Sequence, residues 1–152
     1  MTGQEIHDIC KKYNIQKYSI NSDGSIDASY VDLKNNGLSK LPIKFNKVYG
    51  YFNCSNNDLT TLEGSPKIIT RRPFYINDVC LVYDKLFDCS NNKLISLEGF
   101  PEKVDIGKFN YFNCLNNPLE SLYGYNLPYD KLQCDNKIKL IRKNIIKIIE
   151  KI

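Results

Sequence analysis

Hydrophobic and polar positions along this chain follow a pattern that occurs in four copies. Each copy has two apolar residues separated by one polar residue, then a pair of asparagines, then two leucines three residues apart. The copies begin at Val31, Phe52, Phe87 and Phe112. A unit of this kind cannot bury its own apolar face, so the repeat predicts turns that stack on one another as a solenoid.

The start of each copy predicts a short strand. Phe52 and Cys54 lie two residues apart and enter the core, whereas Asn53 between them points outward. The later leucines extend the same core. The predicted core columns are Val31, Phe52, Phe87 and Phe112; Leu33, Cys54, Cys89 and Cys114; Leu38, Leu59, Leu94 and Leu119; and Leu41, Leu62, Leu97 and Leu122.

The second asparagine of each pair lies where the chain leaves the strand. Its amide can donate to and accept from backbone groups of the turn, and stacked copies predict a ladder. This column is Asn36, Asn57, Asn92 and Asn117. Glycines and prolines then mark a convex return, where tight bends are needed and no sheet has to be continued. They are Gly64, Gly99 and Gly124, with Pro42, Pro66 and Pro101.

The first 30 residues predict an N-terminal cap. Thr2 and Glu5 have capping-box spacing, and the helix that follows has its apolar residues on one face: Ile6, Ile9, Cys10 and Tyr13. Residues 18–31 then alternate around Asn21–Gly24, which predicts a β-hairpin. His7 lies off the apolar face, so we interpret it as a solvated helix residue and not as a catalytic one.

The copies are unevenly spaced. Successive ladder asparagines are 21, 35 and 25 residues apart, and the excess falls within Lys67–Leu86. One interpretation is a surface loop that contributes to binding, with Arg71 and Arg72 as contacts. The other is a degenerate, shortened coil built on Val79, Leu81 and Tyr83.

The repeats end at an imperfect fifth copy, Leu132–Asn136. An isoleucine stripe then predicts a capping helix over residues 137–152. This segment has six basic residues and one acid, a local charge of +5, while the rest of the chain has 15 basic and 16 acidic residues, or −1. The alternative is therefore a basic amphipathic helix that binds nucleic acid or an anionic membrane surface.

The sequence contains no recognisable motif for catalysis, for metal binding or for cofactor binding. The cysteine column is typical of buried free thiols and not of disulfides or a zinc site. We find neither a phosphate-binding loop, nor a paired-histidine motif, nor a nucleophile with a recognisable base. No signal-peptide layout and no uninterrupted apolar span are found, which favours a cytoplasmic protein.

The repeat resembles the leucine-rich repeat, L-x-x-L-x-L-x-x-N-x-L, over residues 28–136. The resemblance implies one α+β domain spanning 1–152, with repeats from 31 to 136 and a parallel sheet on a concave face. The repeat motif F-x-C-S-N-N-x-L-x-S-L-E-G-x-P, which follows the hairpin Asp23–Asp27, is similar to that of leucine-rich repeat proteins of large bacteriophages. That similarity implies an adaptor or inhibitor that binds one host protein, such as an antiviral defence enzyme.

The outward positions of the strands form the candidate binding surface. They fall into three columns: Tyr30, Tyr51, Leu86 and Tyr111; Asp32, Asn53, Asp88, Asn113 and Gln133; and Lys34, Ser55, Ser90 and Leu115. Regularly spaced tyrosines favour a protein-binding face. The alternative is that tyrosine has a high strand propensity and merely covers the sheet. The predicted contacts are Tyr30, Tyr51, Asn53, Asp88, Tyr111 and Asn113, together with Arg71 and Arg72.

Overall fold

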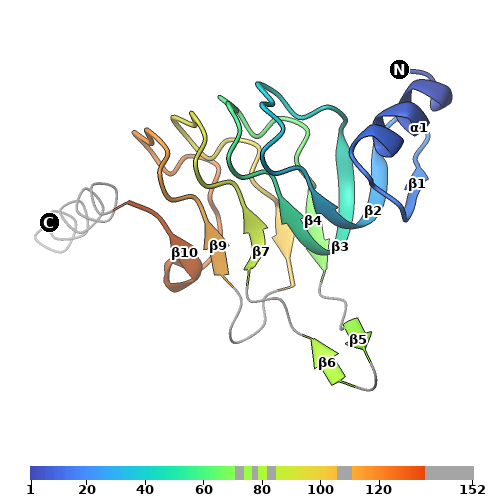
Figure 1. The fold of residues 1–152 in the computed structure, drawn as a ribbon. Helices are drawn as coiled ribbons and strands as arrows, with labels where there is room; N and C mark the ends of the chain where they lie inside the picture. The colour runs from blue at the N-terminus through green and yellow to red at the C-terminus, as the bar shows by residue number, and fades with distance from the viewer. Residues whose placement is uncertain (71–73, 77–78, 82–84, 106–110, 136–152) are drawn as a thin grey trace, which may run out of the picture.

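The chain forms a mostly-β parallel solenoid of about four turns, with one short α-helix among the described residues (Figure 1). The computed structural model describes residues 1–70, 74–76, 79–81, 85–105 and 111–135. The elements in chain order are α1 Gly3–Lys12, β1 Tyr18–Ile20, β2 Ile26–Asp32, β3 Phe45–Asn53, β4 Ile68–Thr70, β5 Phe74–Ile76, β6 Val79–Leu81, β7 Lys85–Asp88, β8 Lys103–Val104, β9 Tyr111–Asn113, the 3₁₀ turn η1 Tyr129–Lys131 and β10 Leu132–Gln133.

Helix α1 begins at the predicted capping box. The Glu5 amide donates to Thr2 Oγ1 at 3.3 Å, and the Thr2 amide donates to Glu5 Oε2 at 2.6 Å. Ile6 and Cys10 are buried, and Figure 1 shows α1 and β1 at one end of the stack. The predicted docking face of this helix is therefore confirmed.

The predicted hairpin is formed by β1 and β2, with Tyr18 opposite Ala28 and Ile20 opposite Ile26. Strand β2 does not stop where the repeats begin. It continues to Asp32 and pairs in parallel with β3. The hairpin and the first repeat thus share one strand, so the boundary that we placed at residue 30 falls inside β2.

The repeat columns meet as the sequence spacing predicts. The main row of strands is β2, β3, β7, β9 and β10, all parallel. Phe52 lies opposite Val31 on one side and Phe87 on the other. Phe87 in turn lies opposite Phe112, which lies opposite Leu132.

A second row of parallel strands follows the return bends at Pro42, Pro66 and Pro101. The first half of β3 pairs with β4, and β4 pairs with β8. The glycines and prolines of the return themselves lie outside the strands, as predicted, and β4 and β8 begin two residues after Pro66 and Pro101. Val48 and Ile69 are fully buried in this row, and such β-branched residues fit a half-buried strand.

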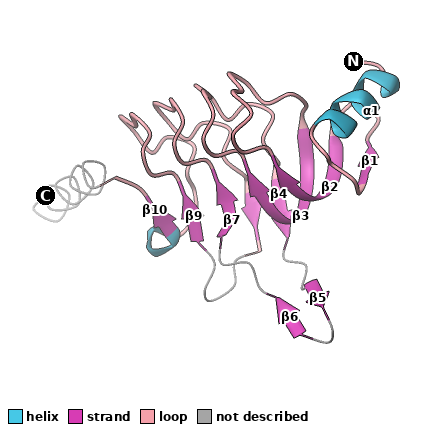
Figure 2. Cartoon of the chain, in the orientation of Figure 1, coloured by secondary structure: helices cyan, strands magenta, loops and turns pink. Residues whose placement is uncertain are grey.

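The extra residues within Lys67–Leu86 form a strand of the solenoid and then a separate hairpin. Residues Ile68–Thr70 are β4, whereas β5 and β6 pair antiparallel, with Tyr75 opposite Cys80. Figure 2 shows the loops of the solenoid along one edge of the strands and this hairpin beyond the other edge. Val79 and Leu81 pair within this hairpin and not with the solenoid, so they do not form the degenerate, shortened coil, and Tyr83 lies outside the described residues.

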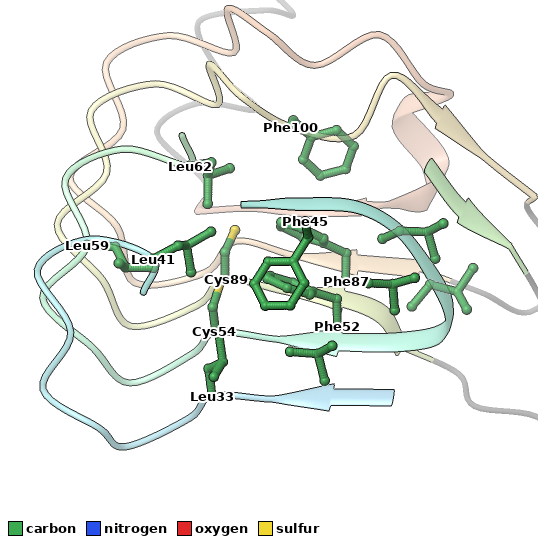
Figure 3. Close-up of a cluster of buried hydrophobic side chains, with 14 of the residues drawn as sticks. Leu33, Leu41, Phe45, Phe52, Cys54, Leu59, Leu62, Phe87, Cys89 and Phe100 are labelled. Carbon is green, nitrogen blue, oxygen red and sulfur yellow. The ribbon is translucent and has the colours of Figure 1, made fainter. Parts of the chain in front are cut away.

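Aromatic rings stack through the core from turn to turn (Figure 3). The Phe52 and Phe87 rings lie 5.4 Å apart and nearly parallel, at 16°. Phe100 packs edge-on between Phe87 and Phe112, at 5.0 and 5.3 Å. Cys54, Cys89, Cys114 and Cys134 are buried free thiols beside this stack, as predicted.

The asparagine ladder is present, and Asn57, Asn92 and Asn117 each bridge neighbouring turns. The Asn92 side-chain amide donates to the carbonyl oxygens of Cys54 and Cys89, each at 3.0 Å. Its Oδ1 accepts from the Leu59 amide at 3.0 Å. The residue before each ladder asparagine has a left-handed backbone, with φ between 53° and 57°, at Asn35, Asn56, Asn91 and Asn116. Asparagine tolerates this conformation better than most residues.

The return bends bring the backbone of one turn against the next. Gly99 has φ +87°, and a Cβ there would lie 2.8 Å from the Leu62 carbonyl. Gly124 has φ +93° and would meet Leu97 in the same way. Both positions need glycine for conformation and for space.

Candidate functional site

The outward side of the main strand row carries one polar row along the stack. The register places Asp32, Asn53, Asp88, Asn113 and Gln133 opposite one another. Neighbouring strands lie about 4.8 Å apart, so the row presents a polar side chain at every turn.

Three residues of this row, expected as outward contacts, are almost completely buried. Asn53, Asp88 and Asn113 are 4%, 5% and 7% exposed. Each side-chain Oδ1 accepts the backbone amide two residues on, at 2.9 Å for Asn53, 3.0 Å for Asp88 and 3.2 Å for Asn113. The side chains fold onto their own strand ends as Asx turns, so they form the base of the surface.

Asp88 has the densest polar environment in the row. Its Oδ1 accepts from the Ser90 amide at 3.0 Å and from Ser90 Oγ at 2.6 Å. Its Oδ2 accepts from Asn113 Nδ2 at 3.2 Å. These donors belong to two adjacent turns, so the carboxylate joins them.

Tyr51 stands half-buried beside this row. Burial and the nearby carboxylates of Asp32 and Asp88 raise the pKa of the Tyr51 phenol well above its ordinary value. The hydroxyl therefore stays protonated at physiological pH.

Tyr30 lies at a distortion of the sheet. It has φ +53° and sits where the β2–β3 register shifts, between Ser29 and Val31. Its ring covers Gly50, because a Cβ at Gly50 would lie 2.6 Å from Tyr30 Cε1. A left-handed tyrosine is a strained conformation, and such residues cluster at functional positions.

Tyr111 is half-buried and extends the row of tyrosines to β9. It pairs with Lys85, and a register shift before Phe87 separates it from Leu86. Leu86 is 2% exposed and belongs to the core, so its expected outward position is wrong. We call Tyr30, Tyr51 and Tyr111 the tyrosine face.

Other predicted contacts fall outside the described residues. They are Arg71 and Arg72. The segment 137–152, predicted as a capping helix with nucleic-acid or membrane binding as the alternative, also lies outside the described residues. The structure therefore assigns them no position relative to the tyrosine face.

Two features were not predicted from the sequence. One is the Asx turns made by Asn53, Asp88 and Asn113, and the other is the contact between His7 and Tyr18. The signal for the Asx turns was the recurrence of Asp or Asn in every copy, since these residues bond their own backbone two residues on. His7 is exposed as predicted, but its Nδ1 lies 2.5 Å from the Tyr18 hydroxyl. No periodic pattern joins those two residues.

Within the described ranges, no group of His, Cys, Asp and Glu side chains could hold a metal ion. In the same ranges, no helix has the length and apolar character to cross a bilayer. Comparison with protein-family models, with curated proteins and with solved structures finds no match to this chain.

Proposed function

We propose that this chain is a leucine-rich repeat protein that binds a protein partner through the tyrosine face. One observation carries the proposal: Tyr51 is a half-buried residue of a strand whose neighbouring row of polar side chains is buried at Asn53, Asp88 and Asn113. Tyrosine supplies a large amphipathic contact at low conformational entropy cost and is enriched among interface hot spots.

The polar row supports this role because it makes the base of the face rigid. The Asn53, Asp88 and Asn113 side chains hydrogen-bond to backbone or to one another. A binding group is effective when the residues beneath it are locked by packing and hydrogen bonds. Since these polar groups are engaged structurally, the proposed role is non-enzymatic.

The proposal for the class of partner is based on the resemblance of the repeat motif to that of leucine-rich repeat proteins of large bacteriophages. We infer a host protein in the bacterial cytoplasm as the partner, with inhibition of an antiviral defence enzyme as the activity to test first. The asparagine ladder and the left-handed asparagines support the leucine-rich repeat assignment, since they recur at the position of the consensus asparagine.

The test is capture of a partner from bacterial lysate with immobilised protein. The face variant is Tyr51→Ala with Tyr111→Ala, and the matched control is Tyr123→Ala, since Tyr123 is 69% exposed at a return bend. We expect one protein to be retained by the wild type and the control and lost by the face variant. Equal retention by a folded face variant would contradict the proposal.

A further inference from the structure

One ladder asparagine differs from the other three in its environment. Asn57, Asn92 and Asn117 are 8%, 7% and 7% exposed, and each donates to three carbonyl oxygens. Asn36 is exposed, and its Nδ2 donates to the Lys34 carbonyl alone, at 3.0 Å. It occupies the open end of the ladder, where no earlier turn covers it.

The residue that follows also differs. Asn36 is followed by Gly37, which is exposed, has φ +62°, and would have no atom within 4 Å of an added Cβ. The next residues in the other copies are Asp58, Lys93 and Pro118. These have side chains that hinder approach to their nitrogen, and proline has no N–H to lose.

The backbone amides around Gly37 differ in their hydrogen bonds. Asn57 Oδ1 accepts the amides on either side, from Asn36 and from Leu38, each at 3.0 Å. Between them, the Gly37 N–H donates no hydrogen bond to any residue that the structure describes. A backbone nitrogen without a hydrogen bond, on a residue without a Cβ, offers the least hindrance to attack on the exposed side-chain amide before it.

We propose that Asn36–Gly37 is a site of spontaneous deamidation. The Gly37 nitrogen loses its proton to water or hydroxide and attacks Asn36 Cγ. A C–N bond forms, the Cγ–Nδ2 bond breaks, and ammonia leaves with the proton that it gains from solvent. Water then opens the five-membered succinimide at either carbonyl, which yields aspartate or isoaspartate.

The product changes the first turn of the solenoid. Either form adds a negative charge, and isoaspartate lengthens the main chain by one methylene. That methylene falls between the two amides that Asn57 Oδ1 accepts. Modification therefore loosens the contact between the first and second ladder positions while the later turns keep theirs.

The test is incubation of the folded full chain at physiological temperature, at neutral and at mildly alkaline pH, followed by tryptic peptide mapping. Cleavage at Lys34 and Lys40 isolates residues 35–40, and residues 86–93 serve as the internal control because they contain Asn92. We expect the conversion of amide to acid, detected as a mass shift, to be at least about tenfold faster at Asn36 than at Asn92. A tenfold ratio of rates corresponds to a difference of roughly 1.4 kcal/mol in barrier height. The rate should rise with pH.

The matched variant is Asn36→Gln, which keeps an exposed amide but closes a six-membered ring slowly. We expect the 35–40 peptide of this variant to remain unmodified. Modification that persists in the variant would place the reaction at Asn35 and overturn the assignment. Equal rates for the 35–40 and 86–93 peptides of the wild-type protein would also overturn it, and this comparison needs no variant to fold.

Discussion

The Asn92 side-chain amide donates to the Cys54 carbonyl oxygen at 3.0 Å, although 38 residues separate the two in the chain. The same amide also donates within its own turn, to Cys89. One side chain therefore joins two turns, and the same join at Asn57 and Asn117 makes it a structural element of the solenoid.

Replacement of Asn92 by alanine removes this join. Buried carbonyl and amide groups lose their partners, and we expect a loss of about 2–4 kcal/mol in the free energy of unfolding. Chemical denaturation measures it. The matched control is Asn36→Ala, which lies exposed at the end of the ladder and should cost less than about 1 kcal/mol. Similar losses for both variants would show that the inter-turn bonds contribute nothing specific.

Glycine at the return bends is required by the approach of successive turns. Gly99→Ala places a Cβ 2.8 Å from the Leu62 carbonyl at a positive φ, and we expect a destabilisation of about 2 kcal/mol or more. The control is Gly3→Ala, where no atom lies within 4 Å. Thermal unfolding should separate the two variants. A Gly99→Ala protein as stable as the wild type would refute the close approach.

The sequence predicted the stacking of equivalent residues but not how far the strands extend. In a solenoid the repeat itself dictates register, so Phe52 and Phe87 had to meet. Strand β4 could not be recognised because Ile68–Thr70 is too short to show alternation. The burial of Asn53 and Asp88 depends on side chains from adjacent strands, so period-two reasoning alone assigned them to the surface. Phe100 fills the core from the position that Ser65 occupies one turn earlier.

The buried thiols predict a stability that falls in alkali. Burial raises the pKa of the Cys54, Cys89 and Cys114 thiols above their ordinary value of 9.0. The contribution of these thiols to the free energy of unfolding is fully present below the pKa that they have in the unfolded chain. It is lost as the pH rises above that value, because the thiols of the unfolded chain ionise first. Urea unfolding between about pH 7 and about pH 10 should show this decline.

The control for the alkaline decline is the triple variant Cys54→Ala, Cys89→Ala and Cys114→Ala. It should show a smaller dependence of the unfolding free energy on pH over the same range, because three of the coupled titrations have been removed. A triple variant with the wild-type dependence would assign the decline to other groups.

The central claim is that the tyrosine face binds a protein partner and the polar row beneath it only supports the face. The most direct test is the affinity of the purified partner for Tyr51→Ala, Tyr51→Phe and Tyr123→Ala, measured by calorimetry. We expect Tyr51→Ala to weaken binding by about 2 kcal/mol or more, Tyr51→Phe to weaken it less, and Tyr123→Ala to leave it unchanged. Wild-type affinity in a folded Tyr51→Ala protein would contradict the claim.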